Sequence, residues 1–192
     1  MFFAASFSAP PVLASQPSTP LTAVVMPDGQ YSGVAIREMG REAAHILKHS
    51  GVSLRWVVGA PAQAVNGLLV VVNLVGHCEM DGSPALLVSG PLGWSHEVNG
   101  TILPFSDLAC DNLRGAVQSA MTGGNQVRGN VLLGRAMGRV LAHELYHIVA
   151  DTSRHGHAGV AQEALSPRQL ISGQLELQPS ESAAVQNALG RR

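Results

Sequence analysis

Two histidines one helical turn apart, with a glutamate directly after the first, are the clearest chemical signal in the sequence. They lie in the segment LAHELYHIV at positions 141–149. On an α-helix, His143 and His147 share one face, so both imidazoles can bind the same metal ion. A Zn²⁺ ion with three protein ligands keeps a fourth position for water, and a neighbouring carboxylate can accept the proton of that water. The spacing therefore predicts a catalytic zinc site in which Glu144 is the general base.

Other histidines must be weighed against this pair, because the chain contains eight of them. His45 and His49 are also four residues apart, but they lie opposite the apolar stripe of their segment, which predicts a solvated surface pair. His77 and Cys78 fall in a polar stretch that is typical of a loop, so we do not assign them to the metal. Only the 141–149 segment combines two histidines and a glutamate within an apolar helical run.

A catalytic zinc site usually takes a third protein ligand. His155 is the preferred candidate, because it follows His147 by eight residues in a segment whose glycine and small residues let the chain reverse toward the helix. The alternatives that the sequence leaves open are His157, Asp151, Glu163 and Glu176.

These residues resemble those of the metzincin-like zinc peptidases. In the usual metzincin pattern the third histidine comes six residues after the second, with a glycine between them, whereas this chain has Ala150 and Ser153 at those positions. The spacing is closer to that of bacterial metzincin-like proteins with a longer stretch before the third histidine, followed by Gly-Ile-Met. Here the corresponding residues are Gly159-Val160-Ala161, so the methionine of the Met-turn is absent. The resemblance is specific over residues 140–161.

The resemblance implies a single α+β domain of the zincin type, with a mixed twisted sheet and an active-site helix that carries the motif. It also implies a zinc-dependent peptidase that acts on a peptide or protein substrate, with Glu144 as general base and acid. The implied metal ligands are His143, His147 and His155.

The alternative is a catalytically silent metal-binding or structural protein with the same fold, in which the metal only ties the loop after the helix to the helix itself. The sequence favours the enzyme, because a structural zinc site closes its fourth position, usually with cysteine. Such a site also has no use for a glutamate beside its first histidine.

Hydrophobic periodicity predicts the elements that must position these residues. The motif helix should run from about Asn130, as N-cap, to about Asp151. Its buried side is expected to consist of Leu133, Met137, Leu141, Leu145, Ile148 and Val149. Further helices are expected at residues 33–49, 107–121, 179–189 and after Ser166-Pro167.

Strands are predicted at residues 23–26, 52–58, 68–75 and 85–89. The near-continuous Leu/Val run at 68–75 is typical of a central strand that is buried on both faces. Residues 102–105 contain Pro104, which cannot donate a hydrogen bond to a sheet, so this piece is expected to be an edge strand or a loop. An edge strand near the motif helix could pair with an extended peptide.

The composition bounds the class of protein. A chain of 192 residues with 46% hydrophobic and 13% charged residues can bury the core of one domain. A net charge of -1 and the lack of any Lys/Arg-rich run argue against nucleic acid or an anionic membrane surface as the main partner. The longest apolar stretch, residues 68–75, is far shorter than a membrane span.

Residues 1–22 are expected to form a signal-like or disordered segment, and residues 23–192 the folded domain. Phe2–Leu13 is apolar, and Val12-Leu13-Ala14 resembles the small-residue pattern before a signal-peptidase site, although a basic region is missing. We therefore expect an exported protein.

The two cysteines, Cys78 and Cys110, are compatible with two arrangements. In an exported protein they would form one disulfide, whereas in the cytosol they would be two buried thiols. Their number alone does not distinguish these arrangements.

Overall fold

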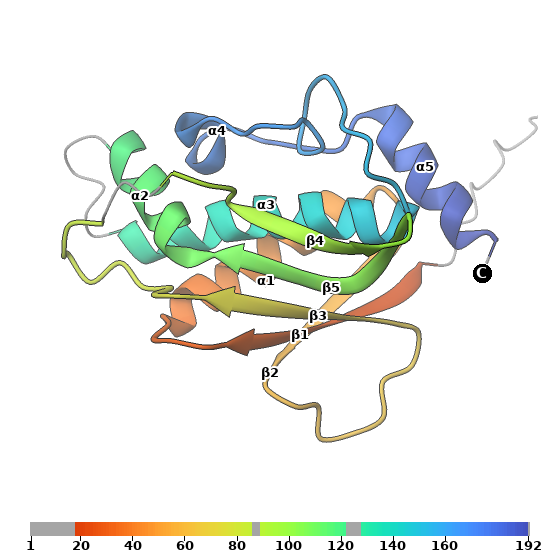
Figure 1. Cartoon of the computed structure of the whole chain (residues 1–192), viewed down its shortest axis with the longest axis horizontal. Coiled ribbons are helices and arrows are strands. Elements are labelled where there is room, and N and C mark those ends of the chain that lie inside the picture. The colour runs from red at the N-terminus through yellow and green to blue at the C-terminus, as the bar shows by residue number, and fades with distance from the viewer. Residues whose placement is uncertain (1–17, 86–88, 122–127, 192) are drawn as a thin grey trace, which may run out of the picture.

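The computed structural model describes residues 18–85, 89–121 and 128–191, which form a mixed α+β fold (Figure 1). The strands are β1 (Thr19–Pro27), β2 (Val52–Val58), β3 (Leu68–Val75), β4 (Gly93–Val98) and β5 (Thr101–Ala109). The helices are α1 (Gly33–Lys48), α2 (Cys110–Ala120), α3 (Gly129–Ala150), α4 (Pro167–Ile171) and α5 (Pro179–Leu189). Residues 1–17 of the signal-like segment and most of the strand expected at 85–89 lie outside the described residues, whereas residues 19–22 of that segment form the start of β1 and belong to the fold.

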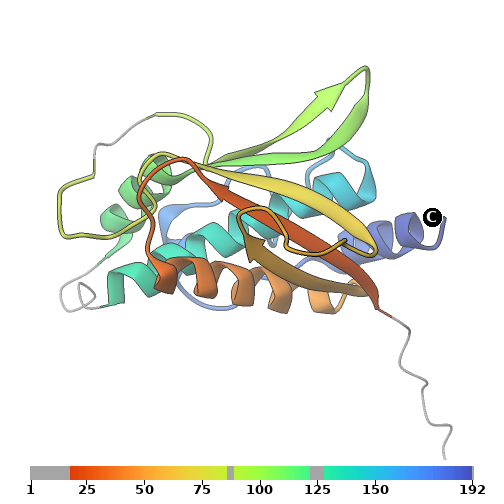
Figure 2. The ribbon, with the colours of Figure 1, turned by 90° about the horizontal axis from the view of Figure 1, so that it is seen from below.

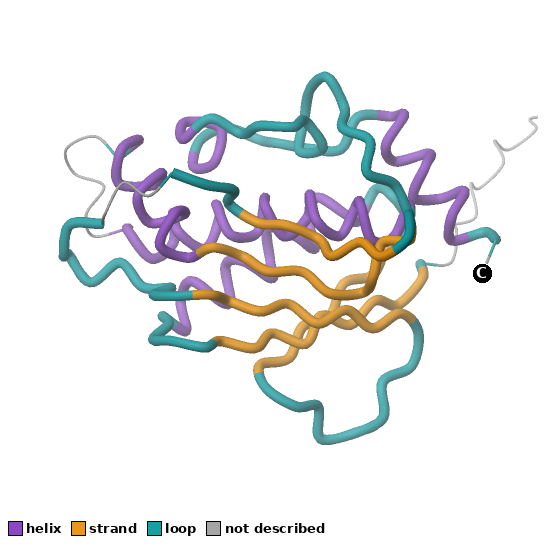
Figure 3. Tube along the Cα trace, viewed as in Figure 1, coloured by secondary structure: helices purple, strands orange, loops and turns teal. Residues whose placement is uncertain are grey.

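The five strands form one sheet in the order β2-β1-β3-β5-β4 (Figure 3). β1 pairs in parallel with both β2 and β3, and β3 pairs in parallel with β5. Only β4 runs antiparallel, because a tight hairpin joins it to β5. Asn99 and Gly100 form that turn with φ of 51° and 80°, the positive values that a two-residue hairpin favours.

Helices α1 and α3 pack against one face of this sheet (Figure 2). On β3, Val70, Val72 and Leu74 are buried, whereas the alternating Leu69 and Val75 are 41% and 38% exposed. β3 is central, as the sequence predicts, but the expected burial on both faces is wrong. An unbroken apolar run does not show whether the second face of a strand is covered.

The edge strand of the sheet is β4, and residues 102–105 belong to β5, which lies between β3 and β4. The register with β3 reaches only Phe105, so residues 102–104 have a neighbouring strand on one side only, and the expectation of an edge is right for this part of β5. Pro104 is tolerated there because the pairing of β3 with β5 begins only at Phe105, and the β4–β5 register shifts beside it.

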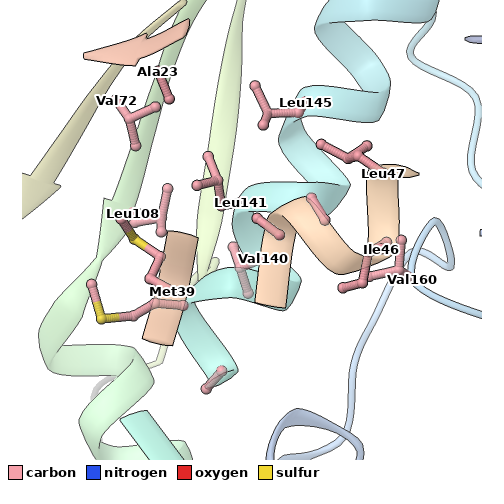
Figure 4. Packing of buried hydrophobic residues seen from close by; sticks show 14 of the residues in the cluster. Ala23, Met39, Ile46, Leu47, Val72, Leu108, Val140, Leu141, Leu145 and Val160 are labelled. Carbon is pink, nitrogen blue, oxygen red and sulfur yellow. The ribbon is translucent and has the colours of Figure 1, made fainter. Parts of the chain in front are cut away.

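Helix α3 is the centre of the core, and its predicted buried side is confirmed (Figure 4). The helix begins at Gly129 with Arg128 as N-cap, so the expected cap at Asn130 is wrong. Asn130 instead accepts a hydrogen bond from the backbone N–H of Met80, at 2.8 Å. This bond ties the start of α3 to the segment that follows β3.

A buried arginine fastens α3 to the segment that follows α4. Arg139 is 1% exposed, and its guanidinium donates to the carboxylate of Glu42 on α1 at 2.8 Å. It also donates to the carbonyl oxygens of Gln169, Ser172 and Gly173. Because each of these contacts satisfies a buried charge, α1, α3 and the end of α4 are held as one unit.

The two cysteines form a disulfide that joins the segment after β3 to the first residue of α2. Cys78 and Cys110 are both buried in the core. The disulfide is compatible with an oxidising compartment. Among the described residues, the structure contains no helix of the length and apolar character that a membrane span requires.

Glycines in α3 allow its close approach to α1, and this packing generates a stability prediction. A Cβ at Gly138 would lie 2.7 Å from the Met39 carbonyl oxygen and from Glu42 Cβ. Alanine favours helix by about 1 kcal/mol over glycine, but overpacking costs about 1–3 kcal/mol. We therefore expect Gly138→Ala to lower the free energy of unfolding in urea.

The matched control is Gly33→Ala at the exposed start of α1. A Cβ at Gly33 would meet only the end of the Arg37 side chain, at 3.5 Å. The control should therefore be neutral or stabilising. Equal changes in the free energy of unfolding at the two glycines would show that the contact between α1 and α3 has room for a Cβ at Gly138.

Candidate metal centre

Three histidines converge at the C-terminal end of α3. His143 and His147 follow each other by one turn, and their Nε2 atoms are 3.0 Å apart. Asp151 ends the helix in the left-handed region, at φ 49°, and the chain then turns back. This reversal places the His155 ring 5.2 Å from that of His143 and 4.8 Å from that of His147, centroid to centroid.

Backbone carbonyls fix the orientation of the two helical histidines. Nδ1 of His143 lies 2.8 Å from the Val160 carbonyl oxygen, and Nδ1 of His147 lies 2.6 Å from that of Thr152. A carbonyl can only accept, so each Nδ1 carries the proton and each Nε2 presents a lone pair. The two Nε2 atoms lie 3.0 Å apart, so both lone pairs are placed to bind one cation.

The histidines are electrically suited to this role. Burial lowers the pKa of His143 to about 4, with a smaller contribution from the neighbouring His147 and His155, while the bond to Val160 opposes the shift. Burial also lowers the pKa of His147. Both rings are therefore neutral at pH 7, the form that binds metal. Together with His155, whose ligand atom lies within 4.8 Å of the others, they could hold a metal ion.

Glu144 lies beside the histidines and contacts the edge strand β4. Its side chain is buried, and Ser95 Oγ donates to Glu144 Oε2 at 2.7 Å. Burial raises the pKa of Glu144 to about 7, although the bonds from Ser95 oppose this shift. Gly93 allows β4 to approach α3 this closely, because a Cβ there would lie 2.6 Å from Val140 Cγ1 and 3.3 Å from Glu144 Oε1.

Two adjoining pockets meet at Glu144. The first, of about 260 Å³, contains the three histidines and lies between β4 and the loop after α3. The second pocket, of about 370 Å³, extends from Glu144 toward α2 and α4. Gly93, His143, Glu144 and Glu163 line both. The three histidines and Glu144 therefore face a cleft that extends in two directions.

The structure separates His155 from the alternative third ligands. Within the described residues, the only group that could hold a metal in this region is His143, His147 and His155. His157 is exposed and outside the group, and Asp151 accepts a hydrogen bond from the backbone N–H of Ile102 at 3.1 Å. Glu163 lines the cleft without joining the cluster.

The remaining candidates agree with their predicted surface or loop roles. His45 and His49 are exposed on and after α1. Cys78 is part of the disulfide, and His77 lies 3.7 Å from Asp81. Ser95 and Gly93 could not be found from local sequence patterns, because their proximity to Glu144 depends on the hairpin that folds β4 against α3.

Comparisons of the sequence with protein-family models and with curated proteins find no match. What the structure shows without any family match is that the motif helix and the loop after it bring three histidines together. At the place of the missing Met-turn methionine, Val160 and Ala161 are fully buried, and the Val160 carbonyl orients His143. This segment supports the histidine cluster by a backbone contact.

The third ligand can be tested by zinc retention. His155→Ala removes one of three donors, so we expect zinc affinity to fall by several kcal/mol. The controls His157→Ala and Glu163→Ala should keep zinc at the same chelator concentration. Retention by His155→Ala together with loss in either control would contradict the assignment.

A second test uses the raised pKa of Glu144 in protein freed of metal by a chelator. The folded-state pKa of about 7 exceeds the unfolded value of 4.5, so folding favours the protonated carboxyl. The resulting destabilisation is absent below pH 4.5, grows between pH 4.5 and 7, and is complete above pH 7. At about 1.4 kcal/mol per pKa unit, it reaches on the order of 3 kcal/mol.

Glu144→Gln removes this ionisation. We expect the metal-free variant to be more stable than the wild type at pH 8, with a difference that shrinks as the pH falls toward 4.5. His143 has the opposite sign, because its lowered pKa destabilises the fold as the pH falls from 6.5 toward 4. Its contribution cancels in the comparison of the two proteins. Urea unfolding at several pH values measures the difference in the free energy of unfolding between variant and wild type. A difference that does not change with pH would show that the pKa of Glu144 is not raised.

Proposed function

We propose that the protein is a zinc-dependent peptidase of the zincin type, with Zn²⁺ held by His143, His147 and His155. The observation that carries this proposal is the convergence of three imidazoles beside a buried glutamate in one cleft. A structural zinc site would use a fourth protein ligand. Among the described residues, the group contains no fourth His, Cys, Asp or Glu.

The residues divide the chemistry of hydrolysis between them. Zn²⁺ bound to the three imidazoles would supply positive charge that acidifies water and polarises a carbonyl group. Glu144 is placed to accept a proton from the attacking water and to deliver it to the leaving nitrogen. Ser95 holds the carboxylate in position, since its hydroxyl donates to Oε2.

The edge strand supports a peptide as the substrate. β4 pairs only with β5 in the described sheet, and it packs against α3 next to Glu144. Backbone groups on the open side of an edge strand can pair with an extended peptide, main chain to main chain. Such pairing would place a peptide bond along the cleft that holds the three histidines.

The larger pocket supports a preference for an apolar side chain next to the cleaved bond. Its walls are mostly apolar and come from the segment before β4, from α2, from α3, and from the segment before α4 together with the first residue of α4. They include Pro91, Leu92, Ala116, Val140, Leu165 and Pro167. At about 370 Å³, the pocket has room for a side chain as large as leucine or phenylalanine.

We also infer that the protein is exported. The disulfide between Cys78 and Cys110 supports this inference, because disulfides persist mainly in oxidising compartments.

The peptidase proposal predicts that Glu144→Gln retains zinc and the fold but loses hydrolysis. Glutamine keeps the size of the side chain but cannot accept the proton, and loss of a general base costs about two to four orders of magnitude in rate. Digestion of a diverse peptide library, with zinc content measured on the same samples, tests this. A wild type that binds one zinc and cleaves nothing would favour the silent metal-binding protein instead.

The apolar pocket predicts a change in specificity for Ala116→Phe. The added ring would fill the pocket, so kcat/KM should fall about tenfold or more for substrates with a large apolar side chain, relative to those with alanine. The control is Ala120→Phe, one turn further along α2, which lines a different cavity. An unchanged preference in Ala116→Phe, or an equal change in both variants, would exclude the pocket as the specificity site.

A further inference from the structure

The ladder between β4 and β5 is interrupted where β4 passes Glu144. Ser95 pairs with Ser106, but the next pair is Glu97 with Ile102, so one residue of β4 faces three residues of β5. The middle one of those three is Pro104, which has no backbone N–H to donate. The edge strand therefore needs another contact to hold its position at this point.

A side-chain network on the outer face of the sheet supplies that contact. His96, the residue opposite the interruption, donates from Nε2 to Asp107 Oδ2 at 2.6 Å. The other carboxylate oxygen, Oδ1, accepts from Asn73 Nδ2 on β3 at 2.7 Å. Asp107 is only 8% exposed, so both of its oxygens are fixed. The network thereby links β3, β5 and β4 in turn.

Ser95 directly precedes His96 and points to the opposite face of the strand, toward α3. Its hydroxyl donates to Glu144 Oε2 at 2.7 Å. Ser106 donates to the Trp94 carbonyl oxygen at 3.3 Å, which is a second and longer contact to β4 near this point. Ser95 is the last residue of β4 that pairs with β5 before the interruption, and the next contact along the strand is that of His96.

We propose that His96 is a positioning residue that acts on Glu144 through Ser95. The bond from His96 to Asp107 holds β4 in place where the ladder is interrupted, and this keeps the Ser95 hydroxyl in contact with the Glu144 carboxylate. The catalytic consequence rests on the proposed peptidase function. The His96 side chain is 44% exposed, so its bond to Asp107 contributes little to global stability, and its effect is local.

A double-mutant cycle on the zinc-loaded protein tests this pathway. Ser95→Ala should lower kcat about tenfold, as loss of a contact that orients an active-site group does, and His96→Ala should lower it severalfold. In the Ser95→Ala background, His96→Ala should have almost no further effect. His96→Gln should recover much of the loss, because its amide can still donate to Asp107.

The control is His45→Ala, which removes an exposed histidine far along the chain from the centre and should leave kcat unchanged. If the effects of Ser95→Ala and His96→Ala multiply, or if His96→Ala has no effect while Ser95→Ala does, the proposed pathway is wrong. The same holds if His96→Gln is as impaired as His96→Ala.

Hydrogen–deuterium exchange provides a readout that does not depend on activity. His96→Ala should speed the exchange of backbone amides in residues 93–97 severalfold, with little change in α1, whereas His45→Ala should not affect β4. If the wild type cleaves no peptide, the peptidase proposal fails, and the exchange result still decides whether His96 holds β4. Unchanged exchange in residues 93–97 of His96→Ala would overturn the inference.

Discussion

The metal centre depends on one constraint, the reversal of the chain directly after α3. Asp151 ends the helix at a positive φ, and the next carbonyl, that of Thr152, orients His147. The returning loop then carries His155 into the cluster, and the Val160 carbonyl orients His143. The same loop therefore supplies the third candidate donor and fixes the tautomers of the other two. Binding of a metal ion here would for that reason be coupled to the conformation of this loop.

The other half of the cleft comes from the sheet. Helix α3 is fixed in place by its close contact with α1 and by the bonds of Arg139. These contacts position the motif opposite β4. The hairpin then brings Gly93 and Ser95 against Glu144. A buried carboxyl with a raised pKa results from this packing, and it lines the same pocket as the three histidines.

Local patterns in the sequence predicted the features that depend on residues close together in the chain. The 3.6-residue period identified α3 and its buried side, the spacing of His143 and His147 predicted their convergence, and small residues in the loop favoured His155. The α+β class is confirmed, whereas the zincin fold itself stays a prediction. The position of Ser95, the place of β5 between β3 and β4 and the open outer face of β3 depend on strand order. Strand order is set by contacts between distant segments, which periodicity does not reveal.

The central claim is that His143, His147 and His155 bind a zinc ion with one position left for a non-protein ligand. X-ray absorption at the zinc edge, combined with elemental analysis of the purified protein, tests this most directly. The account predicts one zinc per chain, three imidazole nitrogens and one further light ligand, at about 2.0–2.1 Å. A chain without zinc under zinc-replete conditions, or a zinc ion with sulfur ligands or four imidazoles, would contradict it.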